Sequence, residues 1–256
     1  CALPYGINTP SVFAYVFLVM LPVKLATGDA NLAWQAGLVA CLGSGIIELC
    51  GSPLAGWLRK NVPRAALLSA LAGIAMTLIS MEFLFRTFAS PIIGLSTLTV
   101  VCLVYFGRFR FHKGIPGGLV AVILGTALAW GLGEAPTSET YELAQLYLPV
   151  PVIGDLWAAL SGEHTMTYLS VILPMGLFNL VGSLQNLDSA EAAGDTFPTT
   201  PSLAANGTGT IAAAMFGSCF PTTIYIGHPG WKGLGARIGY SWLAGIFMTL
   251  VCLTGA

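Results

Sequence analysis

A series of long apolar stretches with very few charges is the feature that most constrains this chain. A helix of about 20 apolar residues crosses the roughly 30 Å hydrocarbon core of a membrane. Only 8% of the residues are charged, against about 25% in a soluble domain. The sequence therefore predicts an all-α, multi-pass integral membrane protein of the plasma (inner) membrane. The predicted spans lie near residues 10–26, 31–52, 64–81, 90–107, 116–133, 167–188, 205–219, 221–233 and 236–255.

The composition and the motifs argue against several classes of function. The net charge of −1 leaves no basic excess for binding nucleic acid. The 6 cysteines lack the paired spacing of a metal site. The sequence contains no Walker A, GxSxG or HExxH motif. We therefore expect neither an enzyme nor an ATP-driven pump, and we expect no cofactor and no metal ion.

Basic residues gather in alternate connections between the predicted spans, which sets the orientation. Because basic loops face the cytoplasm, these connections are predicted to be cytoplasmic and the long connection 134–166 external. The basic residues in question are Arg59, Lys60 and Arg64, then Arg108, Arg110 and Lys113, and finally Lys232 and Arg237.

Two segments, 1–10 and 220–230, interrupt apolar sequence with prolines, glycines and β-forming residues. Non-helical backbone at membrane depth occurs where it is buried in protein or lines a cavity. Two such segments far apart in sequence are typical of a transporter built from inverted repeats. We expect residues 5–9 and 222–226 to be extended, to lie side by side, and to lead into short helices. The alternative is a pair of re-entrant loops that serve packing alone.

One face of the predicted helix at 167–188 and its continuation carries an amide and three carboxyl groups. At 100° per residue these side chains share an arc of about 120°. Such a face is suited to a proton or sodium site beside a polar ligand, unless the helix has already left the membrane and this end is solvated. The side chains are Gln185, Asp188, Glu191 and Asp195.

Two other polar residues leave alternatives open. We interpret Glu48, near the inner end of the second span, as a structural partner of Arg59 or of a neighbouring helix, and not as part of the site. His228 directly follows the second broken segment. It could titrate near neutral pH or serve as a hydrogen-bonded structural histidine.

Several motifs resemble the nucleobase–cation symporter-2 (nucleobase–ascorbate, or xanthine–uracil permease) family. They are Glu191-Ala-Ala-Gly-Asp195, Asn206-Gly-Thr-Gly-Thr210, Phe216-Gly-Ser and Pro221-Thr-Thr-Ile-Tyr-Ile-Gly227. The resemblance implies a 7+7 inverted-repeat fold with short strands in two broken helices. About nine of its fourteen spans are present, so the chain is expected to be part of a longer protein. Residues 1–52 and 167–233 would form mainly the core domain, and 64–133 and 236–255 mainly the gate domain.

The resemblance also implies a function. It suggests a proton- or sodium-coupled symporter for xanthine, uracil or a similar planar solute, working by alternating access in the lipid bilayer, with a homodimer possible. The alternative is an anion carrier of the related sulfate/bicarbonate transporter fold. Three acids around the site argue against an anion, and a neutral or basic site would favour it. Substrate-binding candidates are Glu191, Asp188, Gln185, Tyr225, Ile226, Gly227, His228, Asn8 and Thr9; coupling-ion candidates are Glu191, Asp195 and Asn206.

Overall fold

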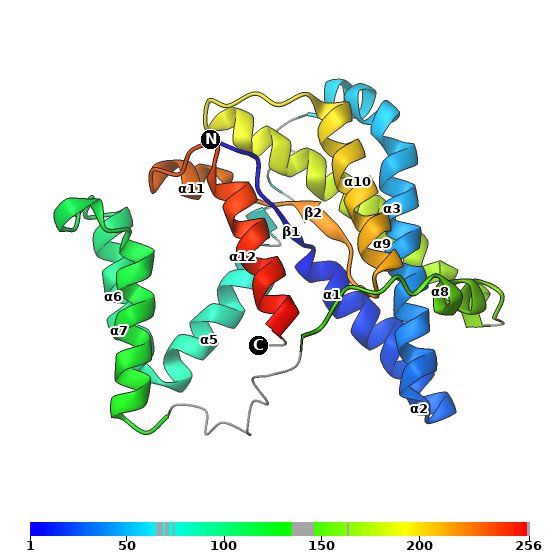
Figure 1. Cartoon of the computed structure of the whole chain (residues 1–256). Coiled ribbons are helices and arrows are strands. Elements are labelled where there is room, and N and C mark those ends of the chain that lie inside the picture. The colour runs from blue at the N-terminus through cyan, green and yellow to red at the C-terminus, as the bar shows by residue number, and fades with distance from the viewer. Residues whose placement is uncertain are drawn as a thin grey trace. The chain divides into compact units, whose positions relative to one another are not determined.

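The computed structural model describes residues 1–63, 65, 69, 72–73, 75–134, 146–162 and 164–254. The chain forms two compact units (Figure 1): unit 1 comprises residues 1–69 and 144–256, and unit 2 comprises residues 70–143. The expected span at 64–81 lies partly outside the described residues. The division of the chain into core and gate domains stays a prediction.

Unit 1 consists of helices around one short strand pair. In chain order its elements are β1 (Tyr5–Ile7), α1 (Thr9–Tyr15), the π-helical η1 (Val16–Met20), α2 (Leu21–Thr27), α3 (Ala30–Asn61), α8 (Ile153–Leu160), α9 (His164–Ala192), α10 (Thr199–Met215), β2 (Thr222–Ile224), α11 (His228–Gly233) and α12 (Tyr240–Thr254).

By length and composition, three of the described helical segments could cross a membrane: Thr9–Thr27, Ala30–Asn61 and Tyr168–Ala192. They coincide with the expected spans at 10–26, 31–52 and 167–188. Shorter apolar helices cover Pro91–Tyr105, Gly117–Gly131 and Tyr240–Thr254. These are the helices of an integral membrane protein. The nine spans, the inverted repeats and the plasma membrane as location stay predictions.

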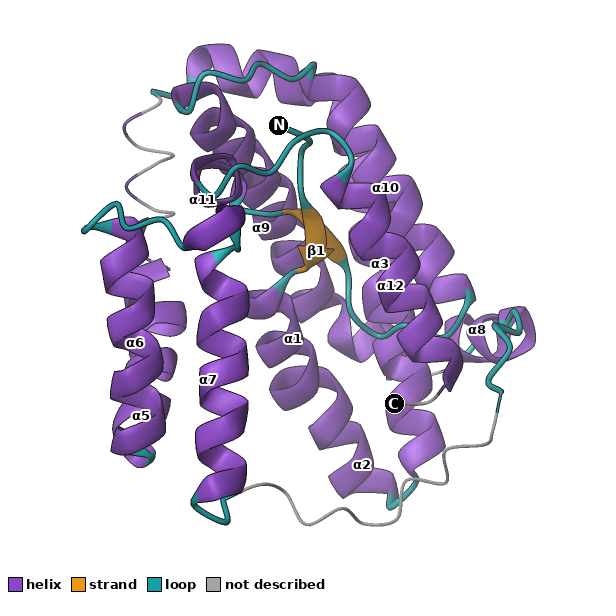
Figure 2. Ribbon diagram, turned by 60° about the vertical axis from the view of Figure 1, so that its left-hand side comes forward, coloured by secondary structure: helices purple, strands orange, loops and turns teal. Residues whose placement is uncertain are grey.

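The two broken segments form an antiparallel strand pair at the centre of unit 1 (Figure 2), so they are extended and adjacent as expected. The strands are shorter than the expected 5–9 and 222–226, because Thr9 already begins α1 and Ile226 lies in a turn. Tyr5 pairs with Ile224, and Ile7 pairs with Thr222. Each strand leads into a helix, α1 or α11, with a proline in its first turn. A proline is tolerated there because the first amides of a helix have no partner within it.

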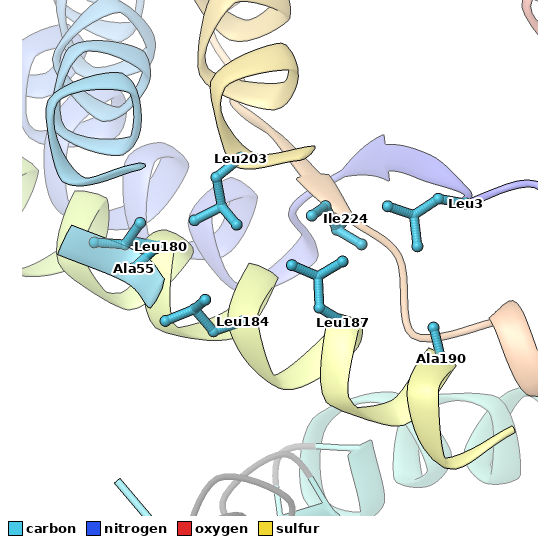
Figure 3. Close-up of a cluster of buried hydrophobic side chains, with 8 residues drawn as sticks. All are labelled: Leu3, Ala55, Leu180, Leu184, Leu187, Ala190, Leu203 and Ile224. Atoms are coloured by element: carbon cyan, nitrogen blue, oxygen red, sulfur yellow. The ribbon is translucent and has the colours of Figure 1, made fainter. Parts of the chain in front are cut away.

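The core of unit 1 gathers beside the strand pair (Figure 3). Leu180, Leu184, Leu187 and Ala190 form one stripe along α9, with the three- and four-residue spacing of a helix face. The stripe packs against buried side chains from the other elements: Leu3, Ala55, Leu203 and Ile224. The core therefore fixes α9 against β2 and α10.

Helix α3 packs closely against α10 through glycines. A Cβ atom added to Gly207 would lie 2.8 Å from the backbone nitrogen of Leu49 and 3.0 Å from the carbonyl oxygen of Gly45. Membrane helices approach so closely where small residues line both sides of the contact. The glycines thus bring polar side chains of α10 within reach of α3.

Unit 2 contains η2 (Ala75–Ser80), α5 (Met81–Ala89), α6 (Pro91–Tyr105), η3 (His112–Gly114) and α7 (Gly117–Gly131). Helices α6 and α7 pack together, with Val104 covering Gly117. On α5, Glu82 and Arg86 form an exposed ion pair one turn apart, with an N–O distance of 2.7 Å.

Substitution at the α3–α10 contact tests this packing. Gly207→Ala should lower the stability of the protein by about 1–3 kcal/mol, because the added methyl group meets backbone atoms that cannot move aside. Gly209→Ala is the matched control, since the nearest atom to its added Cβ would be 4.0 Å away. The measurement is thermal unfolding in detergent. A Gly207→Ala variant that unfolds at the same temperature as the control would contradict the packing.

Candidate functional site

A buried polar cluster surrounds Glu48 beside the strand pair. Glu48 is fully buried. Its Oε1 accepts a hydrogen bond from Ser183 Oγ at 2.7 Å. Its Oε2 accepts hydrogen bonds from Asn206 Nδ2 at 2.7 Å and from Asn179 Nδ2 at 3.0 Å. We refer to Glu48, Asn179, Ser183 and Asn206, together with Thr222 and Thr223 of β2, as the Glu48 cluster.

The two asparagine amides join Glu48 to strand β2. Asn179 Nδ2 and Asn206 Nδ2 each donate to the carbonyl oxygen of Thr222, at 3.0 Å in both cases. Asn179 Oδ1 accepts a hydrogen bond from Asn8 Nδ2. Asn8 also caps α1, since its Oδ1 accepts from the backbone nitrogen of Ser11 at 3.3 Å. Asn179 therefore connects both broken segments to the carboxyl group of Glu48.

The spacing of polar residues on α9 explains this arrangement. Asn179, Ser183 and Asn186 follow one another at intervals of four and three residues, so they share one helix face. That face lies along β2: Ser183 Oγ is 3.2 Å from Thr223 Oγ1, and Asn186 Nδ2 donates to the carbonyl oxygen of Ile224 at 2.5 Å. The polar face of α9 thus supplies the partners that the strand needs inside an apolar helix bundle.

A second cluster pairs two of the predicted site carboxylates with one arginine. Arg59, at the end of α3, donates from Nε to Asp188 Oδ1 at 2.6 Å and from Nη2 to Glu191 Oε2. Its Nη1 donates to Thr199 Oγ1 at 3.0 Å. The Asp188 side chain is 5% exposed. This Arg59 cluster ties the ends of α3 and α9 to the start of α10.

A third cluster holds Asp195. Its carboxylate lies 3.0 Å from Lys232 Nζ and 2.9 Å from His228 Nε2. The hydrogen bond from Lys232 is the main reason that the pKa of Asp195 lies well below its ordinary value. His228 Nδ1 is 3.2 Å from the carbonyl oxygen of Ala2. One ring nitrogen of His228 therefore faces a carboxylate and the other a backbone carbonyl oxygen.

The structure thus separates the predicted site residues. Asn206 belongs to the Glu48 cluster, and Asn8 lies beside it. Asp188 and Glu191 both contact Arg59. Asp195 and His228 contact each other in the third cluster. The remaining candidates are the buried Gln185, the exposed Tyr225 and the partly exposed Thr9, Ile226 and Gly227. Whether these residues bind a substrate stays a prediction.

Glu48 is the residue that sequence reasoning left out of the site. Its partners come from the neighbouring helices α9 and α10, as one of the two readings of the sequence expected. A carboxyl group within a predicted span is a functional candidate by default, so the position of Glu48 within the span 31–52 could have indicated a site residue. Its partners lie more than 130 residues away in sequence, and no local spacing reveals them.

Comparisons with known proteins show the fold. No protein-family model matches the chain, and no curated protein sequence matches it. Among solved structures, the chain is similar to the transmembrane domain of a bicarbonate transporter, BicA, from a cyanobacterium. The TM-score is 0.62 and the sequence identity 17%, covering 99% of this chain and 69% of that chain. The two chains therefore share a fold.

This finding corrects the family suggested by the sequence motifs. The resemblance to the nucleobase–cation symporter-2 family was wrong, because the structural likeness is to a bicarbonate transporter and no family model supports the motif match. The motifs that carried it are short, and part of their pattern follows from the way α9 ends.

Breaking the Arg59 cluster should destabilise the protein. Arg59→Met leaves the buried carboxylate of Asp188 without its arginine, a loss of about 3 kcal/mol. The matched control is Arg86→Met, which removes an exposed ion pair whose arginine side chain is 74% exposed and should cost about 0–1 kcal/mol. Thermal unfolding of both variants in detergent provides the comparison. Equal effects would show that Arg59 and Asp188 are not coupled in the folded protein.

The Asp195 cluster predicts a pH-dependent difference between variants. Because the folded-state pKa of Asp195 is lowered, its stabilising effect is present above the ordinary aspartate pKa of about 3.9 and lost as the pH falls through the folded-state value. Lys232→Met should therefore unfold at a lower temperature than wild type near neutral pH, and the difference should shrink below about pH 4. Lys24→Met, at an exposed lysine, is the control. A difference that is constant with pH would exclude the ion pair as its cause.

Proposed function

We propose that the protein is a secondary transporter that carries a small inorganic anion, such as bicarbonate, across the membrane by alternating access. The observation that carries this proposal is the pairing of cationic side chains with the carboxylates that would repel an anion. Asp188 and Glu191 contact Arg59, and Asp195 contacts Lys232 and His228. The shared fold with the transmembrane domain of a bicarbonate transporter supports the same conclusion.

The charge distribution supports an anion over a neutral solute as the substrate. Free acids at the site would favour a solute that donates hydrogen bonds, and this was the basis for expecting a planar, nitrogen-rich ring. In the structure each of these acids already has a cationic partner at 3.0 Å or closer, and Asp188 and Glu191 share Arg59. Two cations therefore offset most of the negative charge of these three acids, and the electrostatic objection to an anion is weakened.

The first turn of α1, directly after β1, contains one buried side-chain donor that an anion could use. The hydroxyl group of Ser11, in the first turn of α1, is buried and has no hydrogen-bond partner among the described residues. We propose that an anion beside this turn accepts a hydrogen bond from Ser11.

Alternating access requires two bodies, and the chain supplies two compact units. In our proposal unit 1 carries the anion site at its strand pair. A carrier of this kind needs no catalytic residue. Coupling to a proton or a sodium ion and assembly as a homodimer are part of the proposal.

Transport by the reconstituted protein tests this function. In proteoliposomes the protein should take up radiolabelled bicarbonate or sulfate, and unlabelled anion should compete. The control is the same vesicle preparation without protein, and radiolabelled uracil serves as the uncharged solute. Uptake of uracil with no uptake of either anion would overturn the proposal.

Ser11→Ala separates a binding role from a structural one. A hydrogen bond to a charged ligand contributes about 1.5–3 kcal/mol, so anion affinity should fall at least about tenfold. The empty protein should lose no stability, because the removed hydroxyl has no partner in the described part of the chain. Ser96→Ala, at an exposed hydroxyl that donates to its own helix, should change neither property. Unchanged anion affinity in Ser11→Ala would place the anion elsewhere.

A further inference from the structure

Glu48 differs from the other buried or partly buried carboxyl groups described above. It is fully buried in α3, a helix long and apolar enough to cross a membrane. Asp188, Glu191 and Asp195 all have cationic partners, whereas no residue in the described part of the chain forms an ion pair with Glu48. Its surroundings therefore do not fix its charge through a cation.

The hydrogen bonds of Glu48 can serve both protonation states. When the group is ionised, Ser183 donates to Oε1 across 2.7 Å, and the amides of Asn179 and Asn206 donate to Oε2. When Oε1 is protonated, it can donate to Ser183 Oγ, while Oε2 still accepts both amides. Because a hydroxyl hydrogen can rotate, the change requires only that Ser183 turn its own hydrogen away.

After this rotation the hydroxyl hydrogen of Ser183 can point toward an acceptor on strand β2. Ser183 Oγ lies 3.2 Å from Thr223 Oγ1, and Thr223 Oγ1 lies 3.3 Å from the carbonyl oxygen of Ile224, to which it can donate. The chain of donors thus runs from Glu48 through two hydroxyl groups to the backbone of β2. Each hydrogen bond in this chain keeps one donor and one acceptor whether Glu48 is ionised or protonated.

We propose that Glu48 is the group that takes up and releases a proton coupled to transport, and that Ser183 and Thr223 relay its charge state to strand β2. The coupling part of this statement rests on the proposed transport function. The assignment of Glu48 as a carboxyl group that exchanges a proton within the Glu48 cluster does not depend on the transport function.

Few other titratable groups act on Glu48. The side chains that bind Glu48 from α9 and α10 are two amides and a hydroxyl, and the β2 residues of the cluster are threonines, which do not titrate. From β1, the phenol of Tyr5 interacts with it electrostatically. The pH dependence of this cluster is therefore assigned to Glu48, with Tyr5 as the titratable neighbour to control.

The first test is the pH profile of anion uptake in proteoliposomes. Wild-type uptake should change by about tenfold per pH unit on the side where protonation of one group limits the rate. Glu48→Gln keeps the shape of the neutral form, so uptake should persist and vary less than about twofold over the same range. Glu82→Gln, at the exposed ion pair of α5, and Tyr5→Phe should keep the wild-type profile. A wild-type profile in Glu48→Gln would overturn the proposal.

The second test detects protonation of Glu48 directly, without a transport measurement. Infrared difference spectra of the reconstituted protein between acid and alkaline pH should show the carbonyl stretch of a protonated carboxyl group. This band should be lost in Glu48→Gln and kept in Glu82→Gln. If Glu48→Gln does not insert, Glu48→Asp should shift the band. A band that is unchanged in the Glu48 variants would overturn the assignment, whereas absent anion uptake with the expected infrared result would overturn only the transport function.

Discussion

The pairing of two three-residue strands inside an apolar helix bundle is the constraint on which the rest of unit 1 depends. A strand of this kind exposes backbone groups that neither lipid nor an apolar core can satisfy. One edge of β2 is paired with β1. On the other side, the side-chain amides of Asn179, Asn206 and Asn186 donate to the carbonyl oxygens of β2. The unusual polarity of α9 and α10 is the consequence of these broken helices.

The asparagine amides then create a requirement of their own. An amide nitrogen carries two hydrogens, and for Asn179 and Asn206 one hydrogen goes to Thr222 and the other to Glu48. The carboxyl group of Glu48 therefore orients the donors that hold the strand. A change in its charge alters the strength of these hydrogen bonds, since bonds to charged groups are the stronger ones. This is a physical route from a proton to the backbone at the proposed anion site.

Local sequence patterns were sufficient to predict the strand pair and several helices. Prolines and glycines mark where a helix must break, and that information lies within a few residues. The helix periodicity of α9 also predicted that Asp188 and Glu191 share a face. It could not predict what that face meets, because Arg59 is 129 and 132 residues away from the two acids. Long-range ion pairs of this kind offset part of the charge of an acidic face, and local sequence patterns do not reveal them.

The Glu-x-x-Gly-Asp pattern shows how a structural requirement can resemble a family motif. Helix α9 ends at Ala192, and Gly194 adopts a left-handed conformation with φ of 86°. The backbone nitrogen of Gly194 donates to the carbonyl oxygen of Glu191 at 2.9 Å, and that of Asp195 to Ala190 at 3.1 Å. This pair of bonds is a Schellman motif, which requires glycine or a similarly permissive residue at that position. The glycine is therefore explained by helix termination, and the acid after it by its contacts with Lys232 and His228. Both residues meet these requirements whatever the function of the protein, so their presence carries little information about function.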